Sequence, residues 1–263
     1  MKSAVLRVLS VCAIAMMGMV GSLSASHSWS GYHWARTENP FRLKVGDNVS
    51  AVWKPYLAVA ISDWSASDVL DLDADAGGTR AKNCRPTSGR IEVCSASYGN
   101  NGWLGIAQIW ISGSVHITQA TTRLNDYYFA QTRYNTPSWR QFVTCQEVGH
   151  DFGLDHQDED FDNPNLGSCM DYTSDPVTNQ HPNAHDYAQL KTIYAHLDNV
   201  TTVGASTLPS PGMGQRDSDN PAQWGQLVRS AAGGRIEVYE LDFGRGDKMV
   251  THVLWAEGRG DAR

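Results

Sequence analysis

The segment from Gln146 to His156 carries the residues best suited to chemistry, with the sequence QEVGHDFGLDH. In a helix, a spacing of four places Gln146 and His150 on one face, one turn apart, with Glu147 beside them. Gly153 can adopt a positive φ, so the chain can leave the helix there and bring His156 back toward His150. Two imidazoles beside one carboxylate suit metal-assisted hydrolysis, in which zinc polarises a carbonyl and the carboxylate takes up a proton from water.

Residue periodicity predicts the elements that must position this segment. Thr136 and Pro137 are typical of a helix start, as the N-cap and the first helical residue, and this helix runs toward Gly153. Apolar residues at helical spacing predict another helix at about 50–64 and a last one at about 183–197. Short strands are expected at 69–72, 90–97, 103–111, 115–124, 234–241 and 248–255.

The same residues resemble the zinc-binding segment of the metzincin metallopeptidases, whose pattern is H-E-x-x-H-x-x-G-x-x-H followed by a methionine turn. Here the pattern is complete except for its first letter, where Gln146 stands, and Ser168–Tyr172 (SCMDY) is a candidate methionine turn. The resemblance is clear for residues 136–197 and only architectural for 47–135. It implies an α+β fold of the zincin type, with a twisted mixed sheet, an active-site helix, the methionine turn and a closing helix.

The resemblance also implies a role for each matching residue. Glu147 would be the general base, and His150 and His156 would be zinc ligands. Met170 would form the floor beneath the metal, and Tyr172 would touch zinc and stabilise an oxyanion. The implied activity is that of a zinc-dependent endopeptidase. Its polypeptide substrate would add as an extra strand along residues 103–111 or 115–124.

Gln146 departs from the pattern, because the family has its first zinc histidine at this position. Zinc prefers nitrogen and sulfur ligands to a neutral amide oxygen. Two interpretations stay open. In one, His150 and His156 hold zinc with Gln146 or Tyr172 as the third ligand. In the other, the site has lost its metal, and the chain is an inactive protease that binds peptide or protein.

The remaining histidines offer no better ligand by their spacing. Those near the last helix suit a helix cap or a solvated face, and the others show no informative spacing at all. The first group is His181, His185 and His196, and the second is His27, His33, His116 and His252.

Four cysteines lie beyond the N-terminal apolar segment, and in an exported chain an even number is typical of disulfides, with three possible connectivities. No C-x-x-C pair occurs, which disfavours a four-cysteine zinc site. Under the resemblance, Cys145 precedes the first-ligand position and Cys169 precedes Met170, so these two should be close. This predicts the disulfides Cys145–Cys169 and Cys84–Cys94, the second closing a short loop between neighbouring strands.

The N-terminal residues indicate the compartment. Lys2 and Arg7 precede an apolar run from Val8 to Val20 and then small residues, which is typical of a signal peptide at 1–26 cleaved within 22–26. We expect a secreted or periplasmic monomer that is free of the membrane after cleavage. Removal of Lys2 and Arg7 takes the net charge from −7 to −9, and no basic run remains, which disfavours nucleic acid as a partner.

Composition divides the rest of the chain into a catalytic domain at 27–203, a linker at 204–222 rich in Gly, Ser, Pro and Asp, and a small C-terminal β-hairpin module at 223–263. An acidic run after the third ligand position is a candidate for weak Ca²⁺ binding, in addition to the expected Zn²⁺, and the alternative is a solvated loop. This run consists of Asp155, Asp158, Glu159, Asp160 and Asp162.

Overall fold

The computed structural model describes residues 27–206 and 220–258. The expected signal peptide and most of the expected linker lie outside the described residues. No helix among the described residues is long and apolar enough to cross a membrane.

A nine-stranded mixed sheet organises the molecule. Along the sheet the strands follow the order β3-β2-β4-β6-β5-β9-β8-β7, and β1 pairs separately with β6. Strands β1 to β4 and β6 pair in parallel, whereas β5, β9, β8 and β7 are antiparallel to their neighbours. The strands are β1 (His33–Trp34), β2 (Phe41–Asn48), β3 (Leu70–Ala76), β4 (Ile91–Ala96), β5 (Trp103–Ser112), β6 (His116–Asn125), β7 (Gln226–Ala231), β8 (Ile236–Gly244) and β9 (Asp247–Trp255).

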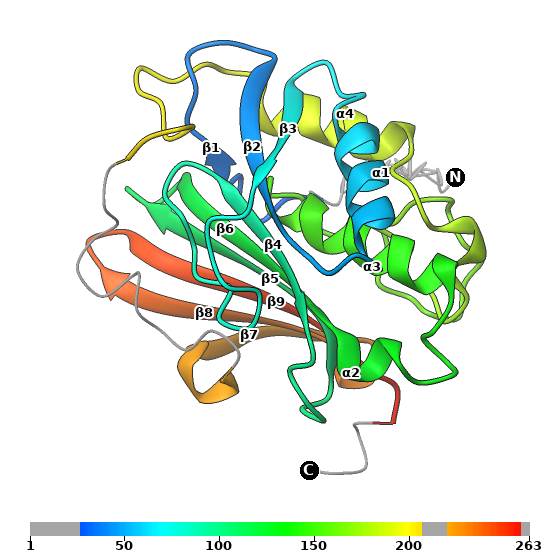
Figure 1. Cartoon of the computed structure of the whole chain (residues 1–263). Helices are drawn as coiled ribbons and strands as arrows, with labels where there is room; N and C mark the ends of the chain where they lie inside the picture. Colours follow the sequence, from blue (N-terminus) through cyan, green and yellow to red (C-terminus); the bar gives the residue numbers. More distant parts are fainter. Residues whose placement is uncertain (1–26, 207–219, 259–263) are drawn as a thin grey trace, which may run out of the picture.

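The longer helices α1, α3 and α4 lie together on one side of this sheet (Figure 1). Trp64, at the end of α1, donates from Nε1 to the carbonyl of Cys145 on α3 at 3.1 Å, which ties the two helices together inside the core. The described α-helices are α1 (Lys54–Trp64), α2 (Asp126–Phe129), α3 (Pro137–His150) and α4 (Ala184–Ile193), with short 3-10 turns at Pro176–Thr178, Pro221–Gln223 and Ala232–Gly234. The chain is therefore an α+β protein, as expected.

The predicted start of the site helix is confirmed. Thr136 has an extended backbone, its side chain accepts a hydrogen bond from the backbone N–H of Trp139 at 3.2 Å, and Pro137 is the first helical residue. The helix ends at His150, and the chain reverses at Gly153, whose φ is +87°. A side chain there would also collide with the carbonyl oxygen of Tyr32, because a Cβ would lie 1.9 Å from it. Glycine is thus required where the sequence predicted it.

Two strands in the N-terminal part and one in the C-terminal part, β1, β2 and β7, were not among the predicted elements. In β2 the apolar residues Phe41, Leu43 and Val45 alternate with Arg42 and Lys44, and the apolar ones are buried. This alternation is the usual sign of a half-buried strand. The two residues of β1 are too few to give such a signal.

The C-terminal hairpin is part of the main sheet, and the expectation of a separate small module at 223–263 needs correction. Strand β9 pairs with β5 from Trp103↔Trp255 to Ile111↔Lys248. Beneath this junction lies a second hydrophobic cluster that joins residues of both strands to Trp224. Large aromatic side chains bury much apolar area, so this cluster fixes the C-terminal strands to β5. In Figure 1 these strands, in orange to red, continue the sheet beyond β5.

This junction also changes the expected peptide-binding edge. Residues 103–111 lie in β5, which is paired with β6 on one side and β9 on the other. Residues 115–124 lie mostly in β6, which pairs with β4 and β5. The expectation that one of these strands is a free edge for substrate is therefore wrong, because main-chain pairing positions on both sides are already used.

Both predicted disulfides are present, between Cys84 and Cys94 and between Cys145 and Cys169. The first joins Cys94 of strand β4 to Cys84 in the loop before it. The second joins helix α3 to the segment that carries Met170. Disulfides persist in oxidising compartments, in keeping with an exported chain.

Removing either disulfide should lower stability by a similar amount but should affect the site differently. The loops they close span 10 and 24 residues. Loop-closure entropy then gives a loss of about 3 kcal/mol for Cys84→Ala/Cys94→Ala and about 3.5 kcal/mol for Cys145→Ala/Cys169→Ala. Chemical denaturation measures both values. Only the removal of Cys145–Cys169 should also weaken metal binding, because this disulfide anchors the segment around Met170 next to the site. Equal metal binding in the two variants would contradict this role.

Candidate metal centre

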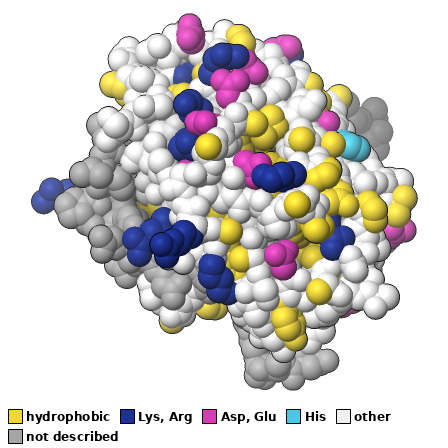
Figure 2. Space-filling view, viewed as in Figure 1, with side chains coloured by type: hydrophobic (Ala, Val, Ile, Leu, Met, Phe, Trp, Pro, Cys, Tyr) yellow, Lys and Arg dark blue, Asp and Glu magenta, His cyan; other side chains and the backbone are white. Residues whose placement is uncertain are grey.

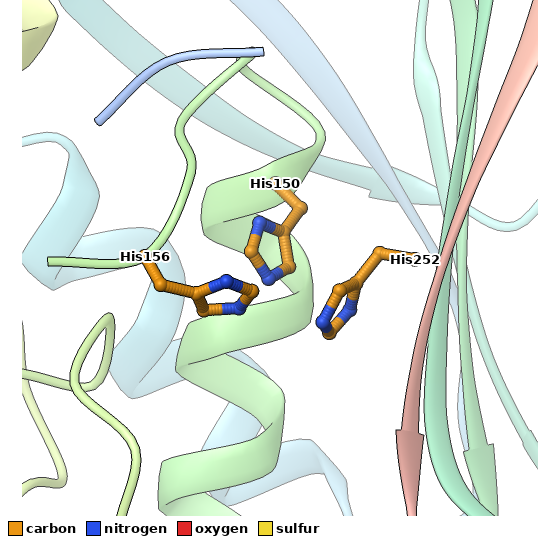
Figure 3. Close-up of side chains that lie close together, drawn as sticks. All are labelled: His150, His156 and His252. Carbon is orange, nitrogen blue, oxygen red and sulfur yellow. The ribbon is translucent and has the colours of Figure 1, made fainter. Parts of the chain in front are cut away.

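Three buried histidines meet between helix α3 and the sheet. His150 is the last residue of α3, His156 lies in the following turn, and His252 points toward them from strand β9 (Figure 3). One nitrogen from each ring lies within 4.8 Å of the others. None of the three side chains is more than 4% exposed. Three imidazoles gathered in this way fit a zinc ion, since histidine nitrogen is one of its common ligands.

Hydrogen bonds fix how these rings present their nitrogens. His150 Nδ1 donates to the carbonyl of Leu154 at 2.9 Å, and its Nε2 has no hydrogen-bond partner among the described residues. His252 Nδ1 donates to Glu147 Oε2 at 3.0 Å. Nδ1 of His156 lies 3.2 Å from Asp155 Oδ1. Each ring thus has a partner on Nδ1. The Nε2 of His150 has none among the described residues, whereas the Nε2 atoms of His156 and His252 lie near the Tyr172 hydroxyl, so a bound metal would replace that contact.

Glu147 is fully buried beside the histidines, as the helical spacing predicted. One of its oxygens holds His252, and the other, Oε1, has no hydrogen-bond partner in the described parts of the chain. The carboxylate packs closely against Gly105 on β5, where a Cβ would lie 2.6 Å from Oε1. Gly105 therefore leaves the space that the carboxylate occupies.

The segment around Met170 packs against helix α3. Met170 is buried, and its sulfur comes so near Gly149 that a Cβ there would lie 2.7 Å away. Gln146 is also buried and donates from Nε2 to the carbonyl of Cys169 at 3.0 Å, while its Oε1 has no partner among the residues described. Gln146 is thus bound through its amide nitrogen to the segment carrying Met170.

Tyr172 reaches the histidines from the same segment. Its hydroxyl lies 2.5 Å from His156 Nε2 and 3.2 Å from His252 Nε2. The side chain is 1% exposed, and its ring stacks on Phe161. Burial raises the pKa of the Tyr172 hydroxyl well above its usual value, and the Glu159 carboxylate raises it further. The hydroxyl is therefore a hydrogen-bond donor beside the imidazoles.

Burial favours the neutral form of His150, His252 and Glu147 as well. It lowers the pKa of His150 and of His252 well below the usual imidazole value, and neighbouring imidazoles lower both further. It raises the pKa of Glu147 well above the usual carboxyl range, with a contribution from Asp151. Neutral imidazoles are the form that binds metal.

Two carboxylates of the acidic run are engaged by a single arginine. Asp155 and Glu159 both pair with Arg229 on β7, with N–O distances of 2.6 Å from Nη1 to Asp155 Oδ2 and 3.2 Å to Glu159. Although burial opposes it, hydrogen bonds from His156 and Arg229 hold the pKa of Asp155 well below the usual carboxyl range. Asp158 and Asp160 accept from backbone N–H groups of their own loop. The structure therefore lends no support to the expected calcium site.

The centre is covered from outside by the N-terminal segment. The Trp29 ring stacks on His150 with a centroid distance of 4.8 Å and an interplanar angle of 8°. Ser28 forms a β-bridge with Leu154. Very little histidine surface is visible on the face shown in Figure 2. His150, His156 and His252 are all buried. A pocket of about 200 Å³ lies beside this cover, and its lining includes Trp29, Tyr32, Asp155, Arg229, Val238 and Val250.

The predicted site residues Glu147, His150, His156 and Tyr172 are thus brought together, whereas His252 was missed. It lies beyond the segment that resembles a known family, and no motif spacing connects it to His150. One signal was available: His252 interrupts the apolar strand sequence Val250–Trp255, where a titratable side chain is buried in the observed sheet. Buried ionisable residues mark candidate functional sites.

No known family model matches this chain, and no curated protein is significantly similar to it. Among solved structures, one match is high choriolytic enzyme 1, a hatching enzyme zinc-protease from Oryzias latipes (Medaka fish). The sequences are 11% identical, the match covers 63% of this chain and 96% of that one, and the TM-score is 0.34. A likeness at this level establishes neither a shared fold nor a shared activity.

Proposed function

We propose that this protein is a zinc-dependent endopeptidase whose metal is held by His150, His156 and His252. The observation that supports this most directly is the convergence of three buried imidazoles beside a carboxylate, Glu147, that has one oxygen without a partner in the described chain. In this proposal His252 takes the ligand place that Gln146 leaves empty in the metzincin pattern.

The residues present fit a zinc ion. His150 Nε2 is a buried nitrogen without a hydrogen-bond partner among the described residues, and burial without a partner is costly unless a ligand satisfies the group. Each ring also has an outer partner on Nδ1, as metal-bound histidines have. When bound, zinc would polarise the scissile carbonyl and lower the pKa of an attacking water.

The chain's own groups then have separate tasks. Glu147 Oε2 orients His252, and Oε1 accepts the proton of the attacking water and passes it to the leaving amine. The Tyr172 hydroxyl, held against His156, donates to the oxygen that becomes negative during attack. In this proposal a polypeptide approaches through the pocket beside Trp29. Displacement of the Trp29 ring, which stacks on His150, then opens the way to the centre.

A second candidate function is peptide or protein binding without hydrolysis. It is favoured by the burial of all three histidines, because a fully covered centre is closed to an attacking water and to a scissile peptide bond. The two functions differ in whether a bound metal is open to water and substrate. They share the same fold and the same ligand residues.

Metal depletion separates them. Purified protein is expected to cleave an unfolded protein substrate such as casein, to lose this activity on dialysis against a chelator, and to regain it when Zn²⁺ is added back. The zinc content of the same samples should fall when His150 is replaced, so His150→Ala serves as the matched inactive variant. Well-folded, zinc-loaded protein that cleaves no peptide bond would instead favour binding without hydrolysis.

A further inference from the structure

A second cluster of histidines, built around strand β1, lies outside the buried centre. His33 on β1 and His116 on β6 are register partners in the sheet, and His196 and Asp198 follow helix α4. Asp198 Oδ1 lies 3.5 Å from His33 Nε2, 3.3 Å from His116 Nε2 and 3.7 Å from His196 Nε2. The Nε2 atoms of His33 and His196 are 3.2 Å apart.

The distances among His33, His196 and Asp198 match three edges of a tetrahedral zinc site. With Zn–N and Zn–O bonds of about 2.0–2.1 Å, neighbouring ligand atoms in a tetrahedron are about 3.3–3.4 Å apart. Three of these atoms, His33 Nε2, His196 Nε2 and Asp198 Oδ1, lie 3.2 to 3.7 Å apart, and their residues form one group of possible metal ligands. His116 lies beside this group, in contact with Asp198, and is not part of it. The rings are also turned edge to face, with interplanar angles of 81° between His33 and His116 and 89° between His33 and His196. The imidazoles of His33 and His196 can then direct their nitrogens at one point without stacking.

Hydrogen bonds outside the cluster prepare the ligand atoms. His33 is 3% exposed and donates from Nδ1 to the carbonyl of Gly31 at 2.8 Å, so in its neutral form Nε2 carries a lone pair. That lone pair faces both Asp198 Oδ1 and His196 Nε2. Two facing lone pairs repel unless a proton or a cation lies between them. Arg36 donates from Nη1 to Asp198 Oδ2 at 2.8 Å, which leaves Oδ1 directed at the imidazoles.

We propose that His33, His196 and Asp198 bind a second zinc ion. Two imidazoles and one carboxylate are ligand types that zinc binds, and a water molecule would complete the tetrahedron. The bound ion would join strand β1 to the segment after α4. The proposal uses none of the residues of the buried centre and does not depend on hydrolytic activity.

Zinc content of untagged protein tests the site. Wild type is expected to retain two zinc ions per chain after gel filtration, and His196→Ala is expected to retain one. His196 suits this test because its side chain is 54% exposed, so its removal should not disturb folding. Loss of an outer partner alone weakens metal sites by up to about 100-fold, so loss of a ligand should raise the dissociation constant by at least about that factor. His181→Ala, at an exposed histidine paired with Asp63, is the matched control.

Thermal unfolding gives a second readout that is independent of activity. Zn²⁺ should raise the Tm of the His252→Ala variant, whose remaining metal site is this cluster, and should no longer do so in His196→Ala/His252→Ala. Equal zinc content in wild type and His196→Ala would overturn the proposal. So would a wild type whose entire zinc content is lost on His252→Ala substitution.

Discussion

Replacing His252 with Ala is expected to remove zinc from the buried centre and to abolish peptide hydrolysis. The substitution leaves two imidazoles. It also leaves Glu147 Oε2, which accepts from His252 Nδ1 in the wild type, facing a cavity. Loss of one of three ligands should raise the zinc dissociation constant by more than about 100-fold, because even outer partners contribute up to that factor. Zinc titration in a His196→Ala background isolates this centre from the second cluster.

Gln146→Leu is the informative control for His252. The structure holds Gln146 through its amide nitrogen on the carbonyl of Cys169, and the proposed ligand set does not include it. This variant should lose some stability, since a buried carbonyl loses its partner, but it should keep zinc and measurable hydrolysis. Loss of zinc in Gln146→Leu together with its retention in His252→Ala would make Gln146 the third ligand.

Glu147→Gln is expected to lower the rate of peptide cleavage by about 10²- to 10⁴-fold while zinc content stays near that of wild type. The amide oxygen of Gln can still accept from His252 Nδ1, so the ligand keeps its orientation. The amide cannot take a proton from water at neutral pH. The change should be seen in kcat more than in KM, because the proton transfer belongs to the transition state.

The control for this variant is Glu237→Gln, another carboxylate that is almost fully buried. Glu237, the second residue of β8, accepts from Trp255 Nε1 at 2.9 Å, and the proposed centre does not include it. Its substitution removes a buried acidic group without touching the proposed base, so cleavage should remain near the wild-type rate. Unimpaired cleavage by Glu147→Gln would remove Glu147 from the mechanism.

The sequence by itself determined the local geometry of the site. The cap at Thr136, the helical spacing of Glu147 and His150, and the reversal at Gly153 depend on residues a few positions apart, and all three are observed. The disulfide from Cys145 to Cys169 followed once the segment around Met170 was expected beneath the helix. Such features can be predicted because backbone conformation and short-range contacts limit each of them to one outcome.

Only the tertiary structure decided which side chain completes the centre. His252 reaches His150 and His156 because β9 pairs with β5 in one particular register. A slip of one residue would turn His252 to the opposite face, toward the cluster around Trp224 and Trp255. The meeting of His33, His116 and His196 likewise depends on the pairing of β1 with β6 and on the path of the chain after α4. Contacts between segments far apart in the sequence are set by packing of the whole sheet, which no local residue pattern encodes.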